Sequence, residues 1–222
     1  LPIIRIGLPA GLQSSIFAIS NVVIQSSINS FGSIAMAGSA AAANIEGFVY
    51  VSMNSVAQAS LSFASQNIGA RRYERISKIS RTCLLLAALF GLVLGNGVYL
   101  LHDTFLRFYS PDPAVIEAGA LRLSVICTTY FLCGLMDTLA SILRAMGKSL
   151  LPMVVTIIGA CGLRVLWIYT VFPLDRTFFT LFLSYPITWG VTAAVHAVCY
   201  FFTKRTMLRR AQASAPSEAS ST

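Results

Sequence analysis

Residues 83–101 read CLLLAALFGLVLGNGVYLL, a run of nineteen positions without a charged side chain. A helix needs about 20 mainly apolar residues to cross the hydrocarbon core of a bilayer. Working outward from this run, the chain shows six such segments, at about 9–31, 35–66, 83–101, 120–143, 150–173 and 178–202. The sequence therefore predicts an all-α membrane protein, with a six-transmembrane-helix bundle over residues 1–205. The polar residues 206–222 are expected to form a disordered cytoplasmic tail.

The composition agrees with a membrane protein. Of the 222 residues, 56% are hydrophobic and 11% are charged, whereas a soluble domain has about 25% charged residues. The net charge of +8 does not indicate a nucleic-acid partner, because the basic residues lie between the apolar segments. The five cysteines have no metal-ligand spacing, so we interpret them as small buried side chains and expect no metal centre built from them.

Basic residues are distributed unevenly among the loops. Twelve of the 16 lie on the side of the bundle that also carries both chain ends. They are Arg5, Arg71, Arg72, Arg75, Lys78, Arg81, Arg144, Lys148, Lys204, Arg205, Arg209 and Arg210. Because Lys and Arg are enriched in cytoplasmic loops, we expect a multi-pass protein of the plasma (inner) membrane with both termini cytoplasmic. Residues 66–80 have apolar positions at helical spacing, which predicts an amphipathic helix along the inner leaflet.

Two expected spans carry stripes of polar side chains. One face of the first span holds four, spaced by seven, four and four residues: Ser14, Asn21, Gln25 and Asn29. The second span repeats polar residues every four positions, beside a methionine: Glu46, Tyr50, Met53 and Asn54. Such stripes either bond neighbouring helices together or line a water-filled cavity. We interpret both stripes, together with Tyr130 in the fourth span, as the lining of a cavity.

Three charged residues fall inside spans, where an unpaired charge costs at least about 2.5–3.5 kcal/mol. Glu46 and Arg164 lie at similar depths, so we hypothesise that they face each other. Asp137 lies closer to the inner end of the fourth span. A desolvated carboxylate can take up a proton or hold a monovalent cation, so all three are candidates for binding the coupling ion or the substrate. The alternatives are a static Glu46–Arg164 pair, and a cap or salt bridge from Asp137 to Arg144 or Lys148.

Four short stretches carry a resemblance to a known family. They are 6–10 (IGLPA), 40–48 (AAAANIEGF), 65–75 (SQNIGARRYER) and 143–149 (LRAMGKS). In order, they resemble parts of the seventh and eighth helices, the following cytoplasmic loop, and the loop after the tenth helix of multidrug and toxic compound extrusion (MATE) transporters. Each stretch is short, and their common order and spacing make the resemblance specific.

The resemblance implies a twelve-helix antiporter of two six-helix lobes, of which this chain is the carboxy-terminal lobe and the amino-terminal lobe is missing. Such a protein exports small amphiphilic or cationic substrates in exchange for protons or sodium ions, and needs no other cofactor. Asp137 matches a tenth-helix position that binds the coupling ion in some branches, which implies a sodium site there. Those branches also carry a seventh-helix glutamate, which the matching stretch 13–17 (QSSIF) lacks. Glu46 or an acidic residue of the missing lobe would replace it.

The expected function is therefore a secondary active efflux transporter for drugs or organic cations. A lipid-linked oligosaccharide flippase shares the broader architecture and would need a more cationic cavity, to which Arg164 would contribute. A non-transporting membrane scaffold is the third alternative, favoured if neutralising Glu46 and Asp137 has no effect. An enzyme is not expected, because the one histidine inside a span, His196, lies near the inner surface without a nucleophile motif.

Overall fold

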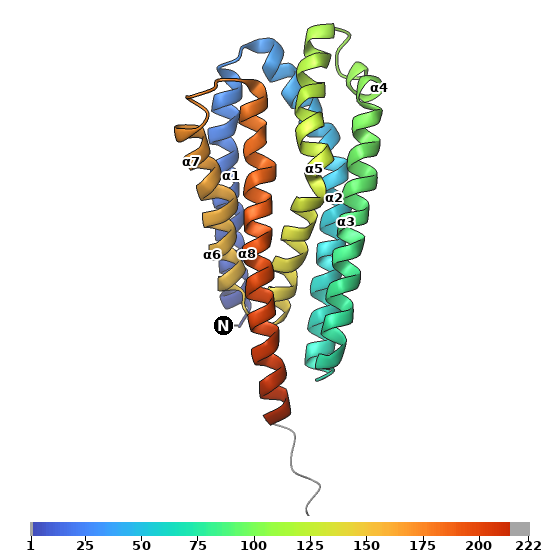
Figure 1. Cartoon of the computed structure of the whole chain (residues 1–222), viewed down its shortest axis with the longest axis vertical. Helices are drawn as coiled ribbons and strands as arrows, with labels where there is room; N and C mark the ends of the chain where they lie inside the picture. The colour runs from blue at the N-terminus through green and yellow to red at the C-terminus, as the bar shows by residue number, and fades with distance from the viewer. Residues whose placement is uncertain (1, 214–222) are drawn as a thin grey trace, which may run out of the picture.

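The chain folds into long helices. The computed structural model describes the backbone of residues 2–213 and the side chains of residues 11–13 and 15–209. The helices are α1 (Pro2–Asn29), α2 (Ser33–Gly69), α3 (Ile76–Leu100), α4 (His102–Arg107), α5 (Pro113–Ala145), α6 (Leu150–Thr156), α7 (Leu163–Thr170) and α8 (Phe178–Ala213) (Figure 1). A 3-10 turn at Tyr73–Arg75 precedes α3, and a π-helical segment at Ile157–Gly162 joins α6 to α7. Residues 2–213 contain no strand, so the all-α prediction is confirmed.

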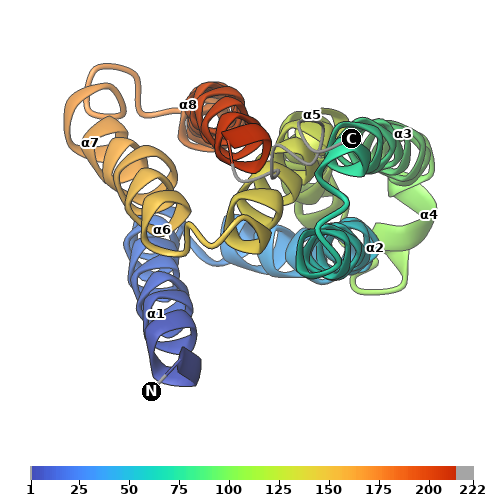
Figure 2. The same ribbon diagram turned by 90° about the horizontal axis from the view of Figure 1, so that it is seen from below.

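Helix α5 is the centre of the packing. Helices α2, α3 and α8 all pack against it, and 67% of its most apolar window is buried, against 22% for the segment Tyr73–Leu100. Gly91 and Gly95 bring α3 close, because a Cβ at either position would overlap the α5 backbone at Phe131 or Cys127. On the other side, α1 packs mainly against the segment formed by α6 and α7 (Figure 2). The bundle therefore contains two groups of helices, one with α2, α3 and α5 and one with α1, α6 and α7. Helix α8 packs against both groups.

Five helices in the described part of the chain are long and apolar enough to cross a membrane. They correspond to the second to sixth expected spans. Helix α1 is not among the five, although its 28 residues give a length of about 42 Å, more than the roughly 30 Å hydrocarbon core. The side chains of its first ten residues lie outside the described part of the chain, and its backbone runs alongside the other helices in the bundle (Figure 1).

Two expectations about the ends of the spans are wrong. Residues 66–80 do not form a separate amphipathic helix, because α2 continues to Gly69 and α3 begins at Ile76. Residues 206–213 are not disordered but extend α8, and the rest of the expected tail, 214–222, lies outside the described residues. Hydropathy detects only the part of a helix that lies in hydrocarbon. The extension of α8 is rich in good helix formers such as Arg, Met, Leu, Gln and Ala, so the helix continues into water.

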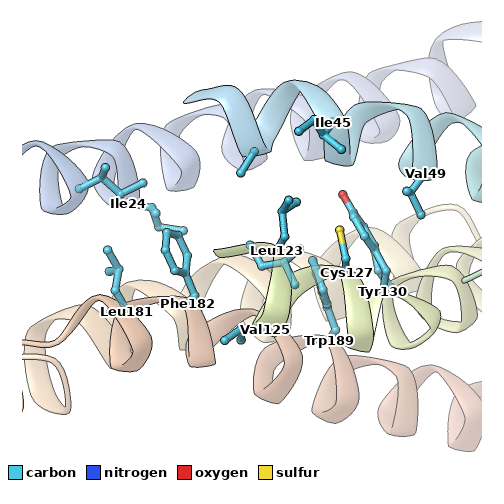
Figure 3. Packing of buried hydrophobic residues seen from close by; sticks show 14 of the residues in the cluster. Ile24, Ile45, Val49, Leu123, Val125, Cys127, Tyr130, Leu181, Phe182 and Trp189 are labelled. Carbon is cyan, nitrogen blue, oxygen red and sulfur yellow. The ribbon is translucent and has the colours of Figure 1, made fainter. Parts of the chain in front are cut away.

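An apolar core fills the half of the bundle opposite the basic loops. It is contributed by α1, α2, α5 and α8, and includes Ile24, Ile45, Leu123, Phe182 and Trp189 (Figure 3). In a bilayer, lipid tails are as apolar as these side chains, so van der Waals packing rather than removal from water stabilises the cluster. The core closes this half and leaves the other half available for a cavity.

Candidate functional site

A cavity of about 650 Å³ lies between α1, α2, α5 and α8. It occupies the middle of the bundle and the half nearer the basic loops. Its wall includes Gln13, Phe17, Asn21, Tyr50, Asn54, Gln58, Tyr130, Cys133, Met136, Asp137, Ser141, Arg144, Tyr185 and Trp189. This volume lies within the range of about 300–1,000 Å³ that is usual for small-molecule sites.

The polar stripes account for much of this wall. Of the residues expected to line a cavity, Asn21, Tyr50, Asn54 and Tyr130 do so. Residues four apart share one helical face, so the α2 stripe brings Tyr50 and Asn54 to the wall together. The cavity interpretation is therefore supported at these positions, and simple bonding between helices does not explain them.

The other expected lining residues have different environments. Gln25 and Asn29 bond to each other, Nε2 to Oδ1 at 3.0 Å, and do not line the cavity. Met53 is only 2% exposed and packs against Gly134, so it belongs to the α2–α5 contact. The side chain of Ser14 lies outside the described residues. In the stripe on α1, Asn21 therefore lines the cavity, whereas Gln25 and Asn29 do not.

Aromatic rings form one side of the cavity. Tyr130 of α5 stacks on Trp189 of α8, with ring centroids 5.3 Å apart and planes inclined by 15°. Tyr185 meets the same indole edge-on at 5.4 Å. These contacts fix Trp189 between two tyrosines, and each such pair stabilises the packing by about 0.5–1.5 kcal/mol beyond its buried area. The aromatic wall is therefore rigid before any ligand enters.

Asp137 is a partly exposed carboxylate in this wall. It forms no salt bridge or hydrogen bond with any side chain in the described part of the chain. Arg144, two turns further along α5, instead donates from Nη2 to Oε1 of Gln13 at 2.8 Å. The alternative of a salt bridge between Asp137 and Arg144 is therefore wrong in this structure. Asp137 faces the cavity with free acceptor oxygens.

Glu46 has the opposite environment. Both of its oxygens accept hydrogen bonds from Arg122, from Nε at 2.8 Å and from Nη2 at 2.9 Å. The third nitrogen of Arg122, Nη1, donates to Oγ of Ser39 at 2.6 Å. Glu46 is 5% exposed and Arg122 is 8% exposed. This two-bond geometry is the strong form of an arginine–carboxylate pair, and it joins α2 to α5 within the closed half of the bundle.

The hypothesis that Glu46 faces Arg164 is wrong. Equal depth fixes only one coordinate of a side chain, and α2 packs against α5 rather than against α7, which carries Arg164. Arg164 is 1% exposed, and its guanidinium carbon lies 4.0 Å from the ring centroid of Tyr185. Its Nη2 donates to Oγ1 of Thr188 at 3.5 Å. It lies behind the cavity wall and stabilises Tyr185 through a cation–π contact.

Sequence patterns alone do not identify several residues of the site. Among them are Arg122, which holds Glu46, Arg144 and Gln13 at the cavity rim, and Trp189 in the aromatic wall. One signal was available on α5, because Arg122, Tyr130, Asp137 and Arg144 are eight, seven and seven residues apart and so share one face. No equivalent signal exists for Gln13, whose partner is 131 residues away.

The described side chains contain no group of three or more His, Cys, Asp and Glu residues that could hold a metal ion. Asp137 is the one acidic residue in the cavity wall. A sodium ion there would have this carboxylate and neutral oxygens such as those of Tyr50 and Ser141 as neighbours, which suits a weakly held monovalent cation.

Long apolar helices around a cavity with polar and aromatic walls define a helical bundle of a multi-pass membrane protein. The chain belongs to the MatE family, whose model matches residues 9–170. The members of this family are transporters and not enzymes. The resemblance to MATE transporters is thereby confirmed.

Individual relatives agree with this family. Over 163 residues the chain is 25% identical to the probable multidrug resistance protein YoeA of Bacillus subtilis, covering 73% of this chain and 35% of that protein. It is 24% identical over 157 residues to the probable multidrug resistance protein NorM of Thermotoga maritima, with 71% and 34% covered. The chain thus spans about a third of the length of these relatives.

Solved structures show the same fold. The Vibrio cholerae MATE transporter VcmN in its bent form superposes with a TM-score of 0.83 at 17% identity, covering 92% of this chain and 46% of VcmN. A MOP superfamily transporter from Pyrococcus furiosus gives 0.83 at 17% identity, with 91% and 45% covered. At this identity the likeness establishes the architecture alone.

Proposed function

We propose that this chain is the carboxy-terminal lobe of a secondary multidrug exporter. The exporter would move cationic or amphiphilic compounds out of the cell in exchange for protons or sodium ions. It would lie in the plasma (inner) membrane with both ends of this lobe in the cytoplasm, beside an amino-terminal six-helix lobe. The observation that carries the proposal is the unpaired carboxylate of Asp137 in an aromatic-walled cavity.

The wall of the cavity suits a flat organic cation. The faces of tyrosine and tryptophan attract cations, by about 0.5–1 kcal/mol at exposed sites and about 2 kcal/mol or more where water is excluded. Tyr50, which is 40% exposed, offers its ring from α2 to the same cavity as Tyr130 and Trp189. Asp137 adds the one negative charge of the wall. Phe17 and Met136 supply apolar and polarisable contacts that tolerate different ligand shapes.

Exchange follows from competition for one carboxylate. A proton or a sodium ion at Asp137 neutralises the charge that holds the cationic substrate. The substrate then dissociates, and the state that binds it better loses population, which is how differential binding shifts a conformational equilibrium. Glu46 is a weaker candidate for this role, because Arg122 occupies both of its oxygens. The coupling role therefore falls to Asp137 within this lobe.

The test is ethidium efflux from cells that express the full-length protein containing this chain. Asp137→Asn removes the charge and keeps the shape, so we expect efflux to fall to the level of cells without the transporter. Glu117→Gln is the matched control, since Glu117 is an exposed carboxylate at the start of the same helix. Normal efflux by Asp137→Asn at equal membrane abundance would contradict the proposal. It would favour a scaffold or coupling within the other lobe.

The flippase alternative has less support from the cavity. Its expected cationic residue, Arg164, lies behind Tyr185 and does not line the wall. Arg144 is the one basic side chain among the lining residues, and it is bonded to Gln13 at the rim. One acid and one base leave the wall without the excess of positive charge that an anionic lipid-linked substrate would need.

A further inference from the structure

A second hollow lies on the opposite side of α1 from the cavity that contains Asp137, which we call the transport cavity. It has a volume of about 520 Å³ and is formed by α1, α7 and the segment between α7 and α8. We call it the α1–α7 groove. Its lining includes Val22 and Val23 of α1 and Ile168 and Phe172 of the facing segment. None of these residues lines the transport cavity, so the two hollows are separate sites.

The groove changes from apolar to polar along its length. Helices α1 and α7 both run away from the basic end of the bundle, side by side (Figure 1). On α1 and the turn that follows it, the lining passes from Val22 to Ser26 and Ser30, over about 12 Å. On the facing side it passes from Ile168 to Arg176, beyond the end of α7. The polar end therefore lies where the helices end, at the level of the membrane–water interface.

Arg176 gives the polar end an uncompensated positive charge. It is exposed and forms no ion pair with any side chain between residues 11 and 209 that the structure describes. The neighbouring Asp175 does not neutralise it directly, because Oδ2 of Asp175 accepts from the hydroxyls of Thr180 at 2.7 Å and Thr177 at 3.2 Å. These bonds direct the carboxylate to the start of α8. The guanidinium remains available for an anionic ligand.

The serine hydroxyls complement a ligand that also donates hydrogen bonds. Ser30 donates to the carbonyl of Ser27 at 2.7 Å, and Ser27 donates to the carbonyl of Val23 at 3.3 Å. Their own protons are thus used within α1, and the lone pairs of their oxygens remain as acceptors. A headgroup with hydroxyl donors next to a phosphate satisfies both the serines and Arg176.

We propose that the α1–α7 groove binds one anionic phospholipid with a polyol headgroup, such as phosphatidylglycerol. Its acyl chain lies along Val22 and Ile168, its phosphate bonds to Arg176, and its headgroup hydroxyls bond to the serines. Tyr169, which lines the groove and is 72% exposed, is placed as aromatic residues are at membrane interfaces. This inference requires only that the helices span a bilayer, and it is independent of the transport proposal.

The test is native mass spectrometry of the full-length protein, purified in detergent and supplied with phosphatidylglycerol or phosphatidylcholine. We expect the wild type to retain one phosphatidylglycerol and to bind phosphatidylcholine at least about tenfold more weakly, since that headgroup has no net charge and no donor. Arg176→Gln should weaken phosphatidylglycerol retention by at least about tenfold. Ser26→Trp should abolish retention by filling the groove.

Arg107→Gln is the matched control, because Arg107 is an exposed arginine at the same end of the bundle and pairs with Asp103. It should retain phosphatidylglycerol as the wild type does. Equal retention by Arg176→Gln and the wild type would overturn the proposal, as would equal binding of the two lipids. No retained lipid in the wild type would also overturn it, because the other lobe or bulk solvent would then cover the groove.

Discussion

The two buried regions around Glu46 and Asp137 contain the same functional group and differ in its partners. Glu46 receives two hydrogen bonds from Arg122 inside the packed half of the bundle, where both side chains are less than 10% exposed. Asp137 faces a cavity and bonds to no side chain in the described part of the chain. A paired carboxylate stabilises a contact between helices, whereas an unpaired one remains available to a ligand or a proton. A charged residue inside a span can therefore be assigned a structural or a functional role only once the structure shows whether it has a partner.

The largest expected effect comes from breaking the paired region. Arg122→Gln leaves the carboxylate of Glu46 buried without a counter-charge, which should cost about 3–5 kcal/mol of stability. Asp137→Asn should change stability by less than about 1 kcal/mol, because it removes no bond within the lobe. Thermal unfolding of the detergent-solubilised full-length protein would measure both.

A double variant separates charge from shape in the same region. Glu46→Gln combined with Arg122→Gln removes both charges and keeps two polar groups that can bond to each other, so it should recover a large part of the loss. If Arg122→Gln unfolds at the wild-type temperature, the pair does not hold α2 on α5. If Asp137→Asn is the less stable of the two single variants, the contrast between the regions is wrong.

The fold was predictable from the sequence where hydropathy decides it. All but the last residue of the run at 83–101 lie within α3, and five of the six expected spans correspond to helices able to cross a membrane. The prediction failed where helices leave the bilayer. At 206–213 a polar helix in water has no apolar signal, and at 66–80 the helical spacing of apolar residues did not reveal the break between α2 and α3. The interruption of the fifth span by a π-helical segment also gave no signal in hydropathy.

The site was predictable only in part, because spacing gives faces but not neighbours. The four-residue repeat correctly placed Tyr50 and Asn54 in the cavity wall. Equal depth in the membrane wrongly assigned Glu46 to Arg164, because depth along a helix does not reveal which helix lies opposite. The bond between Gln13 and Arg144 joins residues 131 positions apart, and only the three-dimensional fold brings them together.

A smaller effect is expected from the third hydrogen bond of Arg122. Ser39→Ala removes the hydroxyl that accepts from Nη1 at 2.6 Å and leaves that donor buried, at a cost of about 1.5–3 kcal/mol. Ser52→Ala is the matched control, because its exposed hydroxyl bonds only to the carbonyl of Phe48 in its own helix. Equal unfolding temperatures for the two variants would mean that a water molecule accepts the hydrogen bond of Arg122 in place of Ser39. Water would then reach the region around Glu46 and Arg122.

In the cavity, removal of one aromatic face should weaken substrate binding without unfolding the lobe. Tyr50→Ala should lower the affinity for ethidium by about 0.5–2 kcal/mol, or roughly 2- to 30-fold. Tyr50→Phe keeps the ring and should bind nearly as well as the wild type. Fluorescence titration of the purified full-length protein measures both. If the two variants are equally impaired, the hydroxyl rather than the ring face carries the interaction.

The smallest expected effect concerns the rim, where Gln13 keeps Arg144 away from Asp137. Gln13→Ala should cost about 0.5–1.5 kcal/mol of stability for the lost hydrogen bond. The released guanidinium lies two turns from Asp137 on the same face of α5, so it would turn toward the carboxylate and compete with a cationic substrate. Ethidium binding should therefore weaken a few-fold.

The combination of Gln13→Ala with Arg144→Gln decides between two explanations of that loss. If the released charge of Arg144 causes it, removing the charge should restore ethidium affinity to at least the wild-type value, although stability stays reduced. If affinity remains low, Gln13 contacts the substrate itself. In that case the bond between Gln13 and Arg144 is not what keeps Asp137 unpaired. Asp137 would differ from Glu46 because the nearest arginine is too far away to pair with it.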